Sequence, residues 1–296
     1  MKKSMKAVLI AGCALVIVGV LLCGVSFMMS GGDPSRYSTP ARSFSRLSYN
    51  ADAAAVTALD VTEVDREVRL QPAEDGEVTV SYCEMDGEGY EIELHGGVLS
   101  IKREVSTDWR EAININIGIQ PDDALIISLP ASFGGDMAIS STSGRITLDG
   151  FVLGDLALSA VSGAVNASDL QVSALDVSVT SGNVKLQNCR CDSGSVSLTS
   201  GKLTMTDIDC AGAWEFSVTS GAITLTDCVA SSVKGETNSG EMKFSALDAA
   251  DVDLKSTSGG ITGSLAGSSA DYSINSRAEN GESNLESRET DAPRWV

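Results

Sequence analysis

The chain has 296 residues and is strongly acidic, with 40 Asp and Glu against 21 Lys and Arg and a formal net charge of −19. A surface of this sign repels phosphate backbones and anionic lipid headgroups, which argues against nucleic acid as a partner. Aromatic residues make up only 5% of the chain, whereas glycine contributes 29 residues, so the composition favours a regular architecture packed from small side chains.

The N-terminal segment predicts a membrane anchor. Residues 7–29 (AVLIAGCALVIVGVLLCGVSFMM) contain no charged residue, and a helix of this length crosses the roughly 30 Å hydrocarbon core of a bilayer. Lysines crowd the short tail 1–6, which favours a cytoplasmic N-terminus and an extracytoplasmic C-terminal domain. No convincing small-x-small cleavage site ends the apolar run, so we expect an uncleaved, single-pass helix in the cell membrane rather than a removed signal peptide.

Two further regions precede the regular part of the sequence. Residues 30–45 contain glycines and prolines and predict a flexible tether. Residues 46–138 alternate apolar and polar positions like strands, for example at 77–82 (EVTVSY) and 98–103 (VLSIKR). Because this second region lacks a strict repeat, we interpret it as an irregular N-terminal β cap.

A Ser-Gly repeat then follows. Its glycines recur every 19 residues, with one spacing of 20. They are Gly144, Gly163, Gly182, Gly201, Gly221, Gly240 and Gly259. The positions two and four residues after each glycine are mostly apolar and those between them mostly polar, which is the period of a half-buried strand. Each Ser-Gly pair is therefore expected at a corner between strands, where glycine tolerates unusual backbone angles.

One repeat is too short to bury its own apolar face. Stacking coils about 4.8 Å apart would bury a continuous inner column. The predicted fold class is therefore all-β: a single-stranded β-solenoid with about 19 residues per coil over residues 139–285, preceded by the N-terminal transmembrane helix. A flexible tail, 286–296, is expected to follow.

Few residues suggest catalysis. The single histidine, His95, lies in a predicted Gly-Gly turn, and the chain has neither a nucleophile elbow nor a phosphate-binding glycine loop. The serines fall in repeat columns, where strand and corner geometry explains them. We therefore expect no enzyme, no catalytic residues and no cofactor.

Four cysteines cluster in three successive coils. Cys191 and Cys210 both lie nine residues after their glycine, so the repeat stacks them in neighbouring coils at a separation that a disulfide can bridge. Cys189 and Cys228 share another column but lie two coils apart, with Ile208 between them. A Cys191–Cys210 disulfide and a column of buried free thiols are both compatible with this pattern.

The column six residues after the glycine is rich in acids. It contains Gly150, Asp169, Asn188, Asp207, Asp227 and Ala246. Stacked carboxylates could bind calcium, but Asp, Asn and Gly are also the residues that corners prefer. We favour the corner interpretation and predict no metal site.

The whole pattern resembles a known family. An N-terminal anchor, alternating strands, Leu129-Pro130 and then the repeats beginning at 139–148 (ISSTSGRITL) are similar to the bacterial putative-adhesin family of β-strand-repeat proteins, a domain of unknown function that includes LiaG-like membrane-anchored proteins. The resemblance covers roughly residues 45–285. It implies a role in the cell envelope or at the cell surface and supplies no catalytic residues.

Three functions are compatible with these observations. The first is a non-catalytic, adhesin-like surface binding module that contacts its partner through a flat Ser/Thr face. That face would include the column two residues before the glycine: Thr142, Val161, Thr180, Thr199, Thr219, Asn238 and Thr257. The second is an envelope-stress accessory or regulatory protein that acts through a membrane-protein partner. The third is a passive structural spacer.

Overall fold

The computed structural model describes residues 44–73, 76–85, 88–105, 123–267 and 272–285, together with Val25 and Met28. The predicted anchor 7–29, apart from those two residues, and both predicted tails therefore lie outside the described residues, as does nearly all of the tether. Within the described part, no helix has the length and apolar character needed to cross a membrane.

The chain divides into two compact units. The smaller comprises Met1–Phe44, Met85–Gly87 and Ser106–Pro121, almost all of it outside the described residues. The larger comprises Ser45–Glu84, Glu88–Val105 and Asp122–Val296 and contains the β-structure described below.

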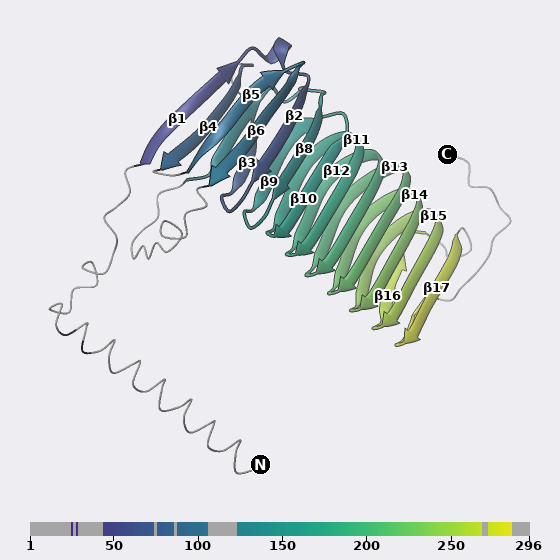
Figure 1. The fold of residues 1–296 in the computed structure, drawn as a ribbon. Coiled ribbons are helices and arrows are strands. Elements are labelled where there is room, and N and C mark those ends of the chain that lie inside the picture. Colours follow the sequence, from purple (N-terminus) through teal and green to yellow (C-terminus); the bar gives the residue numbers. More distant parts are fainter. Residues whose placement is uncertain are drawn as a thin grey trace. The chain divides into compact units, whose positions relative to one another are not determined.

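The larger unit is built from strands and confirms the all-β prediction (Figure 1). The N-terminal elements are β1 (Phe44–Ala51), a 3-10 turn (Ala53–Ala55), β2 (Ala58–Glu63), β3 (Val68–Pro72), β4 (Val78–Met85), β5 (Glu88–His95), β6 (Val98–Val105) and β7 (Leu125–Leu129). The repeat elements are β8 (Asp136–Ser141), β9 (Ile146–Val152), β10 (Leu156–Ser162), β11 (Val165–Ser181), β12 (Val184–Ser200), β13 (Leu203–Ser220), β14 (Ile223–Ser239), β15 (Met242–Ser258), β16 (Ile261–Leu265) and β17 (Ser273–Asn280).

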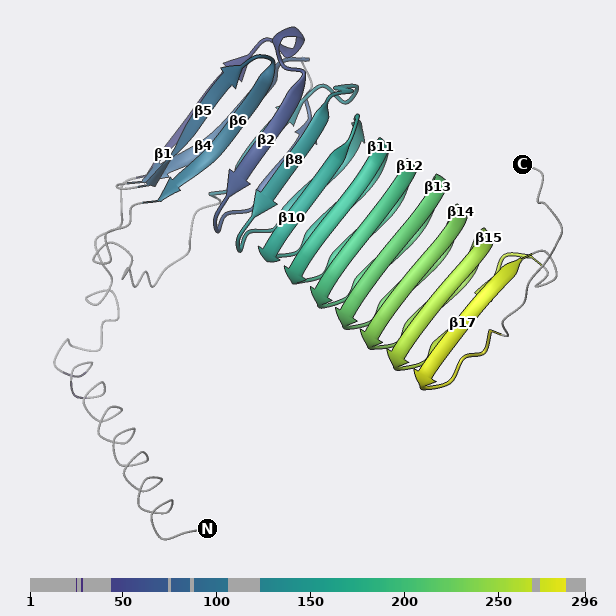
Figure 2. The ribbon, with the colours of Figure 1, turned by 45° about the vertical axis from the view of Figure 1, so that its right-hand side comes forward.

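Successive coils stack in parallel and in register, which confirms the β-solenoid and its period of about 19 residues. Val165 pairs with Val184, Val184 with Leu203, and Leu203 with Ile223. Each long strand serves two faces: the first part of β11 pairs with β9, whereas its last part pairs with β10. Figure 2 shows the strand segments of one face side by side from β8 and β10 to β15 and β17.

The alternation of buried and exposed residues explains how one continuous strand closes a coil. Along β11, buried residues alternate with more exposed ones until two outward residues follow each other, first at 168–169 and again at 173–174. Each interruption turns the chain, and the Ser-Gly segment makes the third corner. The inward residues of all three segments then meet in one core. Val184 and Leu186, from the first segment of the next coil, are 1% and 0% exposed.

Large core residues are matched with glycines in neighbouring coils. The ring of Trp214 occupies the space beside Gly194, where an added Cβ would lie 1.7 Å from a ring carbon. Phe216 fills the space beside Gly235 in the same way. Phe244 fills that beside Gly263. These pairs keep the volume of the core nearly constant along the stack, as close packing requires.

The predicted boundary between an irregular cap and the solenoid at residue 139 needs correction. Strands β2 and β3 form a regular coil, because β2 pairs in parallel with both β6 and β8, and β3 pairs in parallel with both β7 and β9. This coil therefore lies between two others that come later in the sequence. The Ser-Gly period could not indicate it, since its corner is Asp65-Arg66 and its neighbours in the stack are distant in sequence.

The ends of the stack differ from its middle. At the N-terminal end, antiparallel strands follow the last parallel coil: β5 pairs with β6, and β4 pairs with β7. This agrees with the expectation that terminal units depart from the repeat. At the other end, β16 and β17 each pair with β15.

The inward register predicts a sharp contrast between adjacent residues. Val184→Asp should lower the free energy of unfolding by about 3 kcal/mol or more, because it buries a carboxylate without a partner in the apolar core. Lys185→Asp, on the exposed side of the same strand, should change it by about 0.5 kcal/mol or less. Thermal unfolding followed by circular dichroism measures both, and similar shifts for the two variants would contradict the register.

Candidate functional site

The most regular surface of the solenoid is a flat array of hydroxyl groups, called the hydroxyl face below. It consists of Ser178, Thr180, Ser197, Thr199, Ser217 and Thr219. These residues belong to the strand segments that precede three successive Ser-Gly corners. The three serines are direct partners across β11, β12 and β13, and each threonine follows two residues later. Neighbouring rows are therefore about 4.8 Å apart, the spacing of paired strands.

The hydroxyl groups of this face are available to a partner. All six side chains are exposed, and none of their hydroxyls makes a hydrogen bond within the part of the chain that the structure describes. Ser195 just outside the face behaves differently, because its hydroxyl donates to Asp176 Oδ1 at 2.5 Å. The sequence had singled out the threonine column, and the structure adds the serine column beside it.

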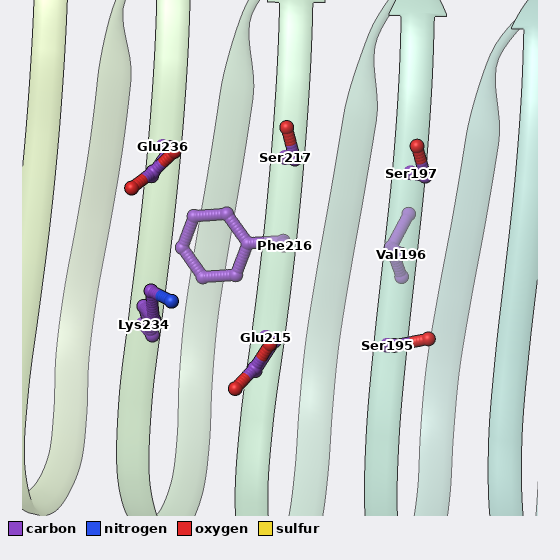
Figure 3. Close-up of a pocket in the computed structure, with 8 residues that line it drawn as sticks. All are labelled: Ser195, Val196, Ser197, Glu215, Phe216, Ser217, Lys234 and Glu236. Carbon is purple, nitrogen blue, oxygen red and sulfur yellow. The ribbon is translucent and has the colours of Figure 1, made fainter.

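A shallow depression borders the hydroxyl face where the outward residues become charged. It has a volume of about 220 Å³, and its lining includes Ser197, Ser217, Glu215, Lys234 and Glu236. Figure 3 shows Lys234 and Glu236 on either side of the ring of Phe216, which lies at the level of Gly235. The depression exists because the outward serine side chains are short, whereas the neighbouring side chains of Glu215, Lys234 and Glu236 are long.

The predicted corner glycines lie directly against the backbone of the adjacent coil. A Cβ added to Gly201 would lie 1.8 Å from the carbonyl oxygen of Gly182, and one on Gly221 would lie 1.7 Å from that of Gly201. Gly163, Gly182, Gly240 and Gly259 show the same overlap with the glycine one coil earlier. Gly144 shows it with Arg66. From Gly201 onward the corner glycines also have positive φ, for example +137° at Gly201. Both the contact and the backbone angle exclude a side chain.

The acid-rich column forms a second kind of corner. Its members Asp169, Asn188, Asp207, Asp227 and Ala246 all have φ between +50° and +54°. Asn188 Nδ2 donates a hydrogen bond to Asp169 Oδ1 in the previous coil. Because Asn, Asp and Gly tolerate the left-handed backbone best, the corner geometry explains this column without a bound cation. The described residues hold no group of three or more His, Cys, Asp or Glu side chains arranged to bind a metal ion.

The stacking predicted for the cysteines is confirmed by the register. Cys191 and Cys210 are direct partners on β12 and β13, and Ile208 separates Cys189 from Cys228. All four are buried free thiols. His95 ends β5 as an exposed residue before a Gly-Gly turn, in the position predicted from the sequence.

A buried ionic cluster near the N-terminal end was not predicted. Glu63 Oε1 accepts a hydrogen bond from Arg103 Nη1 at 3.1 Å and from the backbone N–H of Val64 at 2.9 Å. The hydroxyl of Tyr90 donates to Glu63 Oε2 at 2.5 Å. Arg103 Nη2 also bonds Glu88 at 2.7 Å, and Arg66 lies 3.5 Å from the same carboxylate. The side chains of Glu63, Arg66 and Arg103 are no more than 2% exposed.

The electrostatics of this cluster reflect its burial. Loss of solvent raises the pKa of the Tyr90 hydroxyl, and the adjacent carboxylate of Glu63 raises it further. Burial alone would lower the pKa of Arg103, but the carboxylates of Glu63 and Asp65 outweigh this effect and raise it. The charged groups of the cluster form ion pairs with one another, and Glu63 also accepts a hydrogen bond from the backbone at the corner of the β2–β3 coil. We therefore assign the cluster a structural role. The alternation of the strands indicated that these two charges are buried, because Glu63 and Arg103 fall at inward positions of 58–63 and 98–105.

The fold and its surface define a class of protein: a β-solenoid repeat domain with a regular outward array. Residues 56–292 match the model of the Toastrack DUF4097 family, and because the match spans most of the chain, the chain belongs to this family. This confirms the resemblance seen in the sequence.

Solved structures that resemble this chain share little sequence identity with it. A structure named as a putative adhesin from Bacteroides fragilis is 14% identical, with a TM-score of 0.55 over 76% of this chain and 99% of its own. One named as a putative lipid binding protein from Parabacteroides distasonis is 15% identical, with a TM-score of 0.47 over 84% of this chain and 98% of its own. A search of curated proteins found no match.

The glycine column gives a direct test of the corner geometry. Gly201→Ala should destabilise the protein by about 3 kcal/mol or more, because its Cβ would overlap a backbone carbonyl and the residue has positive φ. The exposed neighbour Ser200 provides the control, and Ser200→Ala should change stability by about 0.5 kcal/mol or less. Unfolding in urea compares them, and a stable Gly201→Ala protein would show that the coils are not in this close contact.

Proposed function

We propose that this chain is a non-catalytic binding module of the bacterial cell envelope, with the hydroxyl face as its contact surface. The observation that supports this most directly is the set of six exposed hydroxyl groups in register without internal partners. Each hydroxyl can both donate and accept a hydrogen bond, so the face offers a dense, uncharged recognition surface on an otherwise acidic protein. The adhesin name of the solved structure with the same fold is consistent with this role.

The arrangement of the face suits an extended partner. Identical groups repeat at about 4.8 Å along the stack, so a polymer lying parallel to the solenoid axis could form similar hydrogen bonds at successive coils. Recognition would rely on hydrogen bonds rather than on stacking, since the outward columns of the face contain no aromatic residue. Glu215, Lys234 and Glu236 at one edge would add local charge selectivity.

The proposal includes the location of the module. Residues 7–29 would act as an uncleaved transmembrane helix behind the cytoplasmic tail 1–6, and the solenoid would lie outside the membrane. The charge-free apolar run and the lysines before it support this topology.

Face-specific cross-linking tests the contact surface. A photoreactive residue replacing Thr199 should give a covalent adduct of higher mass when intact cells are irradiated, because Thr199 lies in the middle of the hydroxyl face. A matched probe at Lys185, which is exposed on another face of the same strand, should give little or none. The two yields are compared by gel mobility and mass spectrometry.

The cross-linking outcomes separate the candidate functions. An adduct with a cell-wall or surface polymer supports the binding module. An adduct with an integral membrane protein, formed equally at both positions, would favour the regulatory accessory. Absence of any adduct at both positions would favour a passive spacer.

The topology predicts sensitivity to external protease. Treating intact cells with a protease should remove the solenoid and leave a short membrane-bound fragment, because the tether predicted from the Gly and Pro residues of 30–45 would be open to cleavage. Immunoblotting for tags at both ends measures this, with a cytoplasmic protein as the integrity control. A solenoid that survives while a known surface protein is digested would refute an outside location.

A further inference from the structure

Two thiols meet at one point of the solenoid core. Cys191 and Cys210 are direct strand partners in neighbouring coils, and both are buried free thiols. Paired residues of adjacent parallel strands have Cα atoms about 4.8 Å apart, within the range that disulfides span. Because corresponding side chains in stacked coils point the same way, the two sulfur atoms face the same small volume.

The backbone at this point has room to adjust. Directly after Cys210 the register shifts, and the extra residue of the 20-residue coil is accommodated between Cys210 and Ala213. Val172 precedes the two cysteines in the same column, and the small side chain of Ala230 follows them. A bulge beside a small residue allows the short approach that a sulfur–sulfur bond requires.

A reagent can reach the pair from outside. A surface cavity of about 310 Å³ is lined by Cys191 together with Arg190, Asp192, Asp209 and Ala211, among others. Cys191 is 5% exposed and lines this cavity. The side-chain interaction between the two thiols raises the pKa of Cys191 and lowers that of Cys210, so Cys210 is the thiol of the pair that ionises more readily.

We propose that Cys191 and Cys210 form an oxidation site, closing a disulfide that joins two successive coils when the chain meets a disulfide oxidant. Two thiols lose two protons and two electrons as the sulfur–sulfur bond forms. A disulfide oxidant takes these up and becomes two thiols, whereas diamide takes them up across its N=N bond and becomes a hydrazine. The inference does not rest on the identity of any binding partner.

The remaining described cysteines lack this geometry. Cys189 and Cys228 are separated by the coil that contains Ile208, and Cys83 belongs to β4. Burial raises the pKa of Cys228 to about 11 and also raises that of Cys189, which suppresses their thiolates. They therefore provide matched control positions within the same core.

A disulfide between Cys191 and Cys210 would oppose the local separation of two neighbouring coils. In a solenoid each coil contacts only its neighbours, so the middle of the stack can separate without unfolding the ends. A bond across one interface closes a loop of about 20 residues and reduces the conformational entropy of the opened and unfolded chain. It therefore raises the temperature at which the two coils separate.

Peptide mapping of the full chain tests the proposal. Protein purified in detergent is treated with glutathione disulfide or with diamide, acid-quenched, alkylated and digested with trypsin without reduction. Cleavage after Arg190 separates Cys189 from Cys191 and should yield a cross-link between peptides 191–202 and 203–234. Because the second peptide also contains Cys228, the cross-link should persist in Cys228→Ala and disappear in Cys210→Ala.

The thermal measurement compares the natural chain with three single cysteine variants. Oxidation should raise Tm by roughly 5–10 °C in the natural chain and in Cys189→Ala, and should leave Cys191→Ala and Cys210→Ala unchanged. Circular dichroism confirms that each variant is folded. The proposal fails if folded protein keeps both thiols alkylatable after treatment with either oxidant, or if the cross-link involves another cysteine.

Discussion

The close approach of neighbouring coils at the glycine column is the constraint on which the rest of the structure depends. At Gly201, Gly221 and Gly240, the carbonyl oxygen of the previous glycine occupies the space that a Cβ would need. Only glycine allows this contact, so every coil of the Ser-Gly repeat from Gly144 onward brings a glycine to the same place, whereas the β2–β3 coil turns at Asp65-Arg66. The contact therefore fixes where each coil turns, and with it the pairing of every residue between two turns.

Fixed register converts a repeated sequence into continuous columns. Inward columns become one core, and outward columns become a surface whose groups repeat at the spacing of paired strands. The core tolerates variation where it is compensated in an adjacent coil, as when the ring of Phe216 fills the space beside Gly235. The outward columns carry no such restriction. The fold does not require the hydroxyl groups of the hydroxyl face. In a solenoid, the residues that stabilise the stack can thus differ from those that recognise a partner.

The sequence predicted this architecture well wherever the constraint leaves a visible period. The Ser-Gly corners, the inward columns and the pairing of Cys191 with Cys210 all follow from counting residues from one glycine to the next. The coil formed by β2 and β3 was missed because its corner contains Arg66 instead of glycine, and because its neighbours in the stack come much later in the chain. Strand parity places Glu63 and Arg103 at inward positions, but it does not show that these two charges meet, so the buried ion pair was not predicted. The depression beside the hydroxyl face could not be predicted either, since it depends on side-chain volumes in three adjacent coils.

The irregular features of the solenoid are concentrated in one place. The extra residue after Cys210, the paired thiols, the insertion of Trp214 beside Gly194 and the depression around Glu215 and Lys234 all belong to the coils of β12, β13 and β14. An insertion in a globular core would disturb packing in every direction, whereas in a stacked repeat it is felt mainly by the coil on either side. This explains how a longer coil persists between regular ones whose glycines still meet. The depression and the cysteine pair therefore belong to the same few coils, although they lie on different strand segments of those coils.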